Sequence, residues 1–481
     1  MPLTRPSPPV PRLGPPQSGA VAPAQKKYLT VSTLGLMTAA SIVTSLRGLP
    51  MMAKEEMTMF AYIGFSTLLF LVPAGLVAAA LGGAFGHRAG GLYVWVGEAF
   101  GKPTGFVAIF LTWVQNIVWY PTGLTFAATA AAFAIGRPDL ATNNVYVGLF
   151  IVVAFCLCTG AALVSTHFAS RVTKYGFLLG TVVPGVVLIA LCLAWLVTGH
   201  AAGWSTATDH AVAVVSHGHS SPRWLPYLTG LSSLSFLAGI LLNFAGVESQ
   251  AVHATELKDA KRGYPVVIMV AAGLSFVIFT LGALAVAGIL PYQDIDINTG
   301  VFDALTHATT GLMHVGWPVR VLAVLICYGA LGGVLAWITG PSRGVLATAR
   351  DGLLPPFMQK TNKAGVQKNI LLVQVVVVAL LSSLYLVVDN VSTVFFLISA
   401  MPSACTSSCT CCCTRRPSGS ATPSPTCRAP SASPAGSPAS GWWAASASSP
   451  SPSPSSWPSS RRPNCPSAVR DCTWAWSPRA P

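Results

Sequence analysis

Long apolar runs recur along most of this chain, and they constrain its fold more than any other feature. A stretch of ~20 apolar residues is long enough to cross the hydrocarbon core of a bilayer as a helix. Nine such runs occupy residues 31–53, 58–82, 104–135, 145–165, 175–198, 226–250, 265–290, 318–340 and 369–388, and a tenth begins near residue 391. Only 9% of the residues are charged, against roughly 25% in soluble domains. We therefore expect a multi-pass membrane protein.

The apolar runs are continuous and do not alternate with polar residues, which argues against a transmembrane β-barrel. A backbone in lipid must satisfy its own hydrogen bonds, so each run is predicted to be a helix. The expected fold class is an all-α membrane protein.

The placement of Lys and Arg predicts the orientation. If the N-terminus is cytoplasmic, sixteen basic residues lie in inner segments and four in outer segments, with Arg47 left out as intramembrane. The outer four are Lys54, Arg137, Arg223 and Arg320. This asymmetry follows the positive-inside rule and predicts a multi-pass protein of the cytoplasmic membrane with its N-terminus inside.

The net charge of +14 is therefore expected to face anionic lipid of the inner leaflet, and no nucleic-acid partner is predicted. No Walker A stretch, HExxH pair or GxSxG elbow stands out, so an enzyme is not expected. We expect no cofactor and no metal. Four cysteines (Cys156, Cys158, Cys192 and Cys327) lie within apolar runs, where packing is the favoured interpretation.

Three regions are expected along the chain. Residues 1–27 are Pro-rich and predicted to be a disordered cytoplasmic N-terminus, and residues 28–401 form the transmembrane core. Residues 402–481 are a tail rich in Ser, Pro and Cys, without apolar periodicity. The tail is either a disordered segment, a weak candidate for a Cys-based metal site, or the product of a frameshift near residue 401. The frameshift is favoured, because with suitable codons another frame encodes an apolar helix followed by basic residues.

Two of the expected helices carry signals of interruption. The first reads GLMTAASIVTSLRGLPMMA, in which Gly48 and Pro50 weaken a continuous helix while Thr44 and Ser45 can bond freed backbone groups. The sixth reads LLNFAGVESQ, in which polar residues and Gly246 interrupt an apolar run. Interrupted spans in corresponding positions of two halves indicate a transporter site between inverted repeats.

Three segments resemble a known family. They are GGLYVWVGEAFG (90–101), FAGVESQAVHATELKDAKRGYP (244–265) and WITGPSRGVLATARDGLLPPFMQKTNKAGVQKN (337–369). They are similar to the amino acid–polyamine–organocation (APC) permeases, and most similar to the glutamate/GABA antiporter group, over about residues 28–401. The resemblance implies ten core helices in a 5+5 inverted-repeat arrangement with broken helices one and six, usually followed by two more. It also implies uptake or exchange of an amino acid by alternating access.

The sequence departs from the family in two places. Val43, Thr44 and Ser45 stand where these permeases often have a Gly-Ser-Gly-like break, and Ala80 stands where a Glu is common. The helices after residue 401 are missing or frameshifted, so a non-functional permease remnant is the alternative to an active transporter. The expected partners are an amino acid substrate, a proton or counter-substrate amino acid, and the lipid bilayer.

The candidate substrate site combines the two breaks with residues on facing helices. Arg47 attracts an anionic substrate group or closes an outer gate, or else its charge reaches the outer interface. Glu248 pairs with Arg47, holds the substrate ammonium or relays a proton, or else it caps freed N–H groups. The candidate residues are Val43, Thr44, Ser45, Arg47, Gly48, Asn116, Tyr120, Asn243, Gly246, Glu248 and Trp337.

The remaining candidates have structural alternatives. Asn116 and Tyr120 share a helix face and line the pocket or pack as core, and Trp337 is a pocket wall or a core residue. Glu256 is expected in a solvated inner loop with its charged neighbours, and Arg343 is expected to be an inner-gate or loop anchor.

Overall fold

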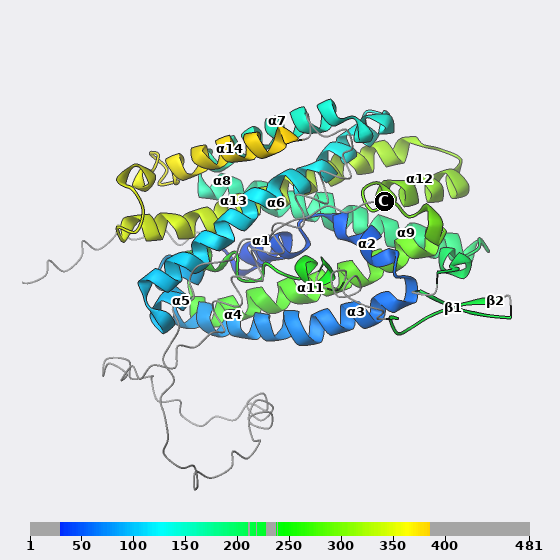
Figure 1. Cartoon of the computed structure of the whole chain (residues 1–481), viewed down its shortest axis with the longest axis horizontal. Coiled ribbons are helices and arrows are strands. Elements are labelled where there is room, and N and C mark those ends of the chain that lie inside the picture. The colour runs from blue at the N-terminus through cyan, green and yellow to red at the C-terminus, as the bar shows by residue number, and fades with distance from the viewer. Residues whose placement is uncertain (1–28, 210–211, 218, 228–236, 238, 385–481) are drawn as a thin grey trace, which may run out of the picture. The chain divides into compact units, whose positions relative to one another are not determined.

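The chain forms a bundle of helices in a computed structural model that describes residues 29–209, 212–217, 219–227, 237 and 239–384 (Figure 1). Its helices are α1 (Val31–Val43), α2 (Leu49–Ala53), α3 (Met59–Ser66), α4 (Val72–Ala84), α5 (Leu92–Phe100), α6 (Lys102–Ala134), α7 (Asn144–Val164), α8 (Thr166–Phe177), α9 (Val183–Val197), α11 (Ala260–Ile289), α12 (Gly300–Met313), α13 (Trp317–Arg350) and α14 (Lys368–Ser382). The strands β1 (Ala213–Ser216) and β2 (His219–Pro222) pair antiparallel.

Seven stretches within the described residues are long and apolar enough to cross a membrane. They are Val31–Ala53, Glu56–Ala84, Lys102–Ala134, Asn144–Val164, Thr166–Val197, Ala260–Ile289 and Trp317–Arg350. They confirm seven of the predicted spans. The fifth and the eighth span extend furthest beyond the prediction: the fifth begins at Thr166 and the eighth ends at Arg350. Their added turns carry Arg171, Lys174 and Arg343, since a helix does not have to stop where the apolar run stops.

Other predictions are only partly covered by the described residues. Most of the predicted span 226–250 lies outside them, and α14 has fifteen described residues. The N-terminal region 1–27, the tenth run near residue 391, and the tail 402–481 with its frameshift also lie outside the described residues.

Local sequence explains where several helices begin. The side chains of Thr30, Asn143, Ser165 and Asp259 each accept a hydrogen bond from a backbone N–H in the first turn of α1, α7, α8 and α11. Such N-caps satisfy N–H groups that have no partner inside the helix.

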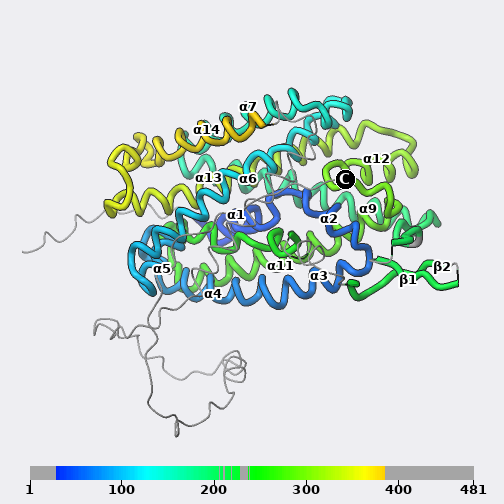
Figure 2. The backbone as a smooth tube through the Cα atoms, viewed as in Figure 1, coloured from blue at the N-terminus to red at the C-terminus, as the bar shows by residue number. Residues whose placement is uncertain are grey.

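The first apolar span lies in the interior of the bundle. In the most apolar window of Val31–Ala53, 78% of the residues are buried, against 28% in that of Glu56–Ala84. Figure 2 shows α1 between α13 and α11, and it packs against both of these helices and against α8. A helix in this position is surrounded by protein and not by lipid.

The outer helices expose apolar side chains instead. On α7, Val145, Leu149, Val153 and Leu157 recur every four residues and are each at least 50% exposed. An exposed apolar stripe of this kind fits a lipid environment, whereas a helix at a water surface shows polar residues there.

Helix α13 packs along α6 and α8. Glycines allow the approach to α8 and to the π-helical turn Leu178–Val182 that follows it. A Cβ added to Gly180 would lie 2.2 Å from the Leu325 carbonyl oxygen and 2.3 Å from the Gly329 nitrogen. A Cβ added to Gly176 would lie 3.2 Å from the Gly332 Cα. Close backbone contact between small residues is the usual way in which helices associate in lipid.

The two ends of the bundle carry different connections (Figure 1). At one end, here called the α5 end, Tyr93 donates a hydrogen bond to Asp351 at 2.6 Å and Lys102 pairs with Asp351 at 3.1 Å. The other end, here called the α12 end, carries α12 and the β1–β2 hairpin. Segments that we predicted to be cytoplasmic, including those with Arg88, Lys102 and Lys258, meet at the α5 end.

Candidate functional site

The first apolar span is broken at Thr44 and Ser45. Helix α1 ends at Val43, Thr44 has φ of 46°, and Ser45 is extended with φ of −164°. A 3₁₀ turn (Leu46–Gly48) and α2 follow. A positive φ is costly for a β-branched residue and is a feature of functional sites.

The break lies earlier than Gly48 and Pro50, the residues that we expected to weaken the helix. Pro50 sits in the first turn of α2, where a missing N–H costs nothing because that group has no helical partner. The predicted interruption is present, but the proline begins the second segment and does not end the first.

A second break follows residues 239–243, which are helical. Residues 244–250 are not helical, and a 3₁₀ helix (Ala251–Glu256), here called the 3₁₀ segment, comes next. Gly246 has φ of +110°, and a Cβ there would lie 2.6 Å from the Trp337 ring and 3.2 Å from the Ser41 carbonyl oxygen. Only glycine satisfies both the backbone angle and the space.

Both breaks meet at the middle of α13. Trp337 Nε1 donates to the carbonyl oxygen of Ser41 at 2.9 Å and approaches Thr44 Oγ1 at 3.3 Å. Gln250 Nε2, from the second break, donates to Ser41 Oγ at 2.8 Å and to the Ala336 carbonyl oxygen at 3.0 Å. Residues more than 200 positions apart in the sequence are thereby joined through one buried polar network.

An aromatic pair and a cation lie beside this network. The rings of Trp119 and Trp337 are 6.4 Å apart between centroids. Arg47 Cζ lies 5.8 Å from the centroid of the Trp119 ring, within reach of a cation–π contact. Gly123 makes room for Trp119, since a Cβ there would lie 2.8 Å from the indole ring. The half-buried guanidinium is thus held close to the two breaks.

Two more predicted residues lie together where the broken helices approach each other. A Cβ at Gly48 would be 2.7 Å from Asn243 Oδ1, and Asn243 Nδ2 donates to the Gly239 carbonyl oxygen at 3.0 Å. The backbone N–H groups at Gly246 and at Glu248 itself interact favourably with the carboxylate of Glu248. This favours the capping alternative, and a contact of Glu248 with Arg47 or with a substrate stays a prediction.

Asn116 and Tyr120 lie one turn apart on α6. Tyr120 is fully buried and its ring lies 4.9 Å from that of Phe155, while Asn116 is 3% exposed. Their surroundings favour the packing alternative, and their role in a pocket stays a prediction.

Three residues of this region were missing from the predicted site: Ser41, Trp119 and Gln250. Trp119 is next to Tyr120, and aromatic residues occur on more than one side of the helix there, so the sequence does not single out Trp119. Gln250 carried a usable signal, because it is an amide inside an interrupted apolar run.

A separate ionic cluster lies at the α5 end. Glu256 was expected in a solvated loop, and this was wrong: its side chain is 0% exposed. It pairs with Arg343 of α13, and its Oε2 lies 3.4 Å from Nδ1 of the equally buried His253. Burial raises the pKa of Glu256, but His253 and Arg343 outweigh it and lower the pKa to about 2.

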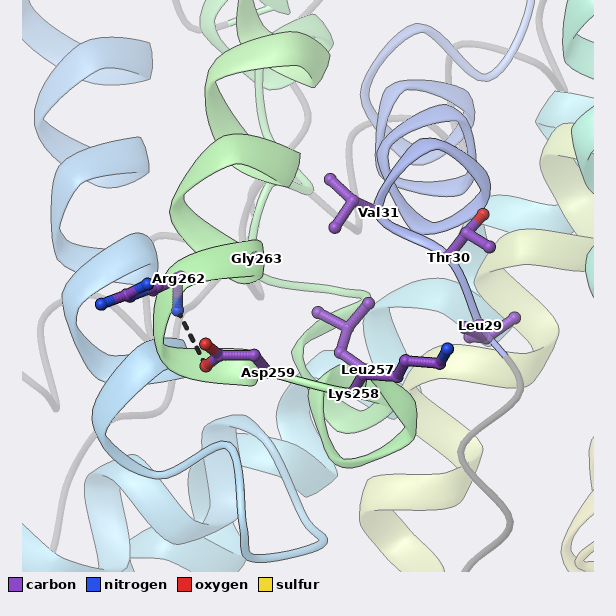
Figure 3. A pocket seen from close by; sticks show the side chains of 8 residues that line it. All are labelled: Leu29, Thr30, Val31, Leu257, Lys258, Asp259, Arg262 and Gly263. Atoms are coloured by element: carbon purple, nitrogen blue, oxygen red, sulfur yellow. Dashed lines mark hydrogen bonds between the residues drawn. The ribbon is translucent and has the colours of Figure 1, made fainter.

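Close to this cluster, a cavity of about 450 Å³ opens between the start of α1 and residues 257–263 (Figure 3). Leu29, Val31 and Leu257 supply apolar walls, and Asp259 accepts a hydrogen bond from the Arg262 backbone. None of the eleven predicted site residues lines this cavity. Within the part of the chain that the structure describes, no group of three or more His, Cys, Asp or Glu residues is arranged to hold a metal ion.

Comparison with known proteins identifies the family. The family model described as amino acid permease matches residues 28–413. The chain belongs to this family. An uncharacterized transporter of Legionella pneumophila is 36% identical over 379 residues, which are 78% of this chain and 77% of that protein.

Two further matches are informative. A glutamate/gamma-aminobutyrate antiporter of Lactococcus lactis is 29% identical over 344 residues, covering 71% of this chain and 65% of the antiporter. The chain thus spans less than two thirds of that relative. The crystal structure of MhsT in complex with L-phenylalanine matches with a TM-score of 0.53 at 14% identity, over 79% of this chain and 89% of MhsT. That likeness shows a shared fold.

Proposed function

We propose that this permease is a secondary active amino acid transporter of the cytoplasmic membrane that works as an exchanger by alternating access. Its N-terminus is cytoplasmic, and the fold contains a 5+5 inverted repeat. The single observation that carries the proposal is that the two helix breaks meet beside Trp337. Trp337 and Gln250, which belong to α13 and to the second break, both donate hydrogen bonds to Ser41 near the first break.

The two breaks offer both poles that a zwitterion needs. The carboxylate binds at the first break, where a new helical segment begins with a positive dipole end and the Arg47 guanidinium lies close by. The ammonium binds at the carbonyl groups freed after residue 243, where a helical segment ends. Gln250 Oε1 is a further acceptor beside the breaks, since it is buried and has no hydrogen-bond partner among the described residues.

The positive charge of Arg47 determines which net charge a substrate can carry. A charge at the centre of a spanning helix costs about 2.5–3.5 kcal/mol on insertion scales, so it is kept for a function. Next to Trp119 and the first break, its guanidinium attracts an anionic group on the substrate and repels an organic dication. The substrate class is therefore an amino acid with no net positive charge, and the name of the Lactococcus relative supports a glutamate-like amino acid.

Exchange in proteoliposomes tests this function. Vesicles loaded with one amino acid and supplied outside with a labelled one should exchange them through the wild-type chain. Arg47→Ala and Glu248→Gln should each lose most of the exchange while inserting normally, and Arg171→Ala, which removes an exposed arginine of α8, should keep it. Unchanged exchange in both site variants would remove the proposed site.

A second candidate follows from the change of composition after Met401. If a frameshift replaces the end of helix ten and the later spans, the chain is a non-functional permease remnant. Sequencing the gene and restoring the frame decides between the two, because a remnant gains exchange only after restoration.

A further inference from the structure

Glu256 connects two elements through buried charge. It is the last residue of the 3₁₀ segment, and one of its carboxylate oxygens, Oε1, accepts a hydrogen bond from Arg343 Nη1 of α13. Nη1 also lies 3.1 Å from His253 Nδ1, at the third position of the same segment. The side chains of Glu256 and His253 are 0% exposed and that of Arg343 is 17% exposed. We call these three residues the Glu256 latch.

The same residue also holds the beginning of α1. The backbone N–H of Leu29 donates to the Glu256 carbonyl oxygen at 3.4 Å, and Leu29 pairs with Leu257 in a parallel bridge. Figure 3 shows Leu29 and Leu257 next to each other where α1 begins. Glu256 therefore joins the chain ahead of α1, the 3₁₀ segment and α13 at one point.

These three elements are the ones that form the candidate substrate site. Helix α1 leads into the first break, the 3₁₀ segment follows the second break, and α13 carries Trp337 between them. The latch lies further along the same elements, at the α5 end. A movement that opens a path from the breaks to this end must separate α1 or the 3₁₀ segment from α13.

The energetics of a buried ion pair make such a contact two-state. Two charges taken out of water are compensated only while both partners are in place, and removing one leaves a costly unpaired charge. Partial separation is therefore unfavourable. The pair is stable either when it is closed and dry or when it is fully open and hydrated.

We propose that the Glu256 latch is the inner gate of this transporter, with Glu256 and Arg343 as positioning residues that hold the α5 end closed. This rests on the proposed function, which makes the α5 end cytoplasmic. The latch does not touch the substrate. It acts by setting how often the 3₁₀ segment and α1 separate from α13.

Hydrogen–deuterium exchange on the purified full chain tests the latch without requiring transport. Backbone N–H groups in the 3₁₀ segment are protected by bonds such as His253 N to the Gln250 carbonyl oxygen at 3.0 Å. Arg343→Gln should accelerate exchange roughly tenfold or more in residues 251–257 and 29–34. Exchange in α12, at the other end, should not change.

Matched variants separate a gate from a static contact. Glu256→Gln should act like Arg343→Gln, and the double variant should open no further than either single one, because the two act through one contact. Arg343→Lys keeps the charge and should restore part of the protection. Arg350→Gln, on the same helix but exposed, should match wild type.

Three results would overturn the latch. They are additive effects of the two single variants, no change in any variant, or equally faster exchange throughout the chain with a lower Tm. If Arg343→Gln does not fold, Arg343→Lys and Glu256→Asp give the same comparison with a smaller loss of stability, because each keeps the charge of the original residue. Local opening in a chain that binds no amino acid would count against the transport function alone. Normal amino acid exchange by a chain without local opening would count against the latch alone.

Discussion

At the scale of single residues, the candidate site depends on one glycine and one tryptophan. Gly246 bends the second break with φ of +110°, and the Trp337 indole occupies the space that a side chain at 246 would need. Trp337 then reaches the Ser41 carbonyl oxygen at the end of α1. The substitution of either residue is expected to disturb both breaks at once.

Gly246→Ala tests this arrangement. The added Cβ would be 2.6 Å from the Trp337 ring, and the strained backbone and the overlap together should cost about 2–4 kcal/mol. Thermal unfolding of the purified protein measures the loss. Gly273→Ala in α11, where a Cβ meets nothing within 4 Å, is the matched control, and equal stability of the two variants would contradict the geometry.

The pKa of Glu256 predicts a pH dependence of stability. Its pKa is lowered from 4.5 to about 2 in the folded protein, so between these values the unfolded state binds the extra proton. The stabilisation from this carboxylate is therefore complete above pH 4.5 and is lost as pH falls from 4.5 toward 2. Melting curves of wild type and Glu256→Gln across this range should converge at low pH. A constant difference between the two would show that the carboxylate is not the titrating group.

At the scale of elements, α13 is the helix against which α1 and α8 pack. Its glycines allow backbone contact with the π-helical turn after α8 and with the first break, since a Cβ on Gly333 would be 2.2 Å from the Thr44 carbonyl oxygen. No side chain larger than hydrogen fits at these crossings. The spacing of α8, α1 and α13 is therefore set by backbone atoms.

Two glycine-to-alanine changes on helices measure this contact. Gly180→Ala places a Cβ 2.2 Å from the backbone of α13 and should cost about 2 kcal/mol or more. Gly160→Ala, on α7 with nothing within 4 Å, should be neutral or stabilise by up to about 1 kcal/mol, because alanine favours a helix. Thermal unfolding compares them, and a stabilised Gly180→Ala would rule out the close crossing.

Sequence patterns predicted where the helices lie better than they predicted which residues contact each other. Apolar length located seven spans, because the bilayer requires that length whatever the packing. Both interruptions were predicted, but the first lies at Thr44, where no Gly or Pro marks it. Glu256 was misassigned because its neighbours Lys258 and Asp259 are exposed, whereas its partner Arg343 is 87 positions away. Long-range pairing of this kind leaves no local pattern.

At the scale of the whole molecule, segments that the placement of Lys and Arg predicts to be on the same side of the membrane lie at the same end of the bundle. Segments predicted to be cytoplasmic gather at the α5 end, where Lys102 pairs with Asp351 and Leu29 with Leu257. Lys54, which follows α2, is the one lysine among the residues predicted to be outside. The orientation in the membrane can therefore be tested by asking from which side of the membrane these lysine amines react.

Labelling of intact cells with an amine reagent that does not cross membranes tests the orientation. Lys54 should react from outside, whereas Lys360 and Lys363 should react only after the membrane is permeabilised. Peptide mass spectrometry of the purified protein identifies the modified lysines, and Lys54→Arg controls for the assignment. Modification of Lys360 or Lys363 from outside would reverse the predicted topology.

Equilibrium binding to the purified chain tests the central claim, that the two breaks hold both poles of one amino acid. Labelled glutamate should bind saturably, and it should be displaced by unlabelled glutamate but at least about tenfold more weakly by analogues that lack either the α-amino or the α-carboxylate group. Gly246→Ala should weaken binding of glutamate. Equal displacement by the analogues that lack one pole, or undiminished binding in Gly246→Ala, would contradict the account.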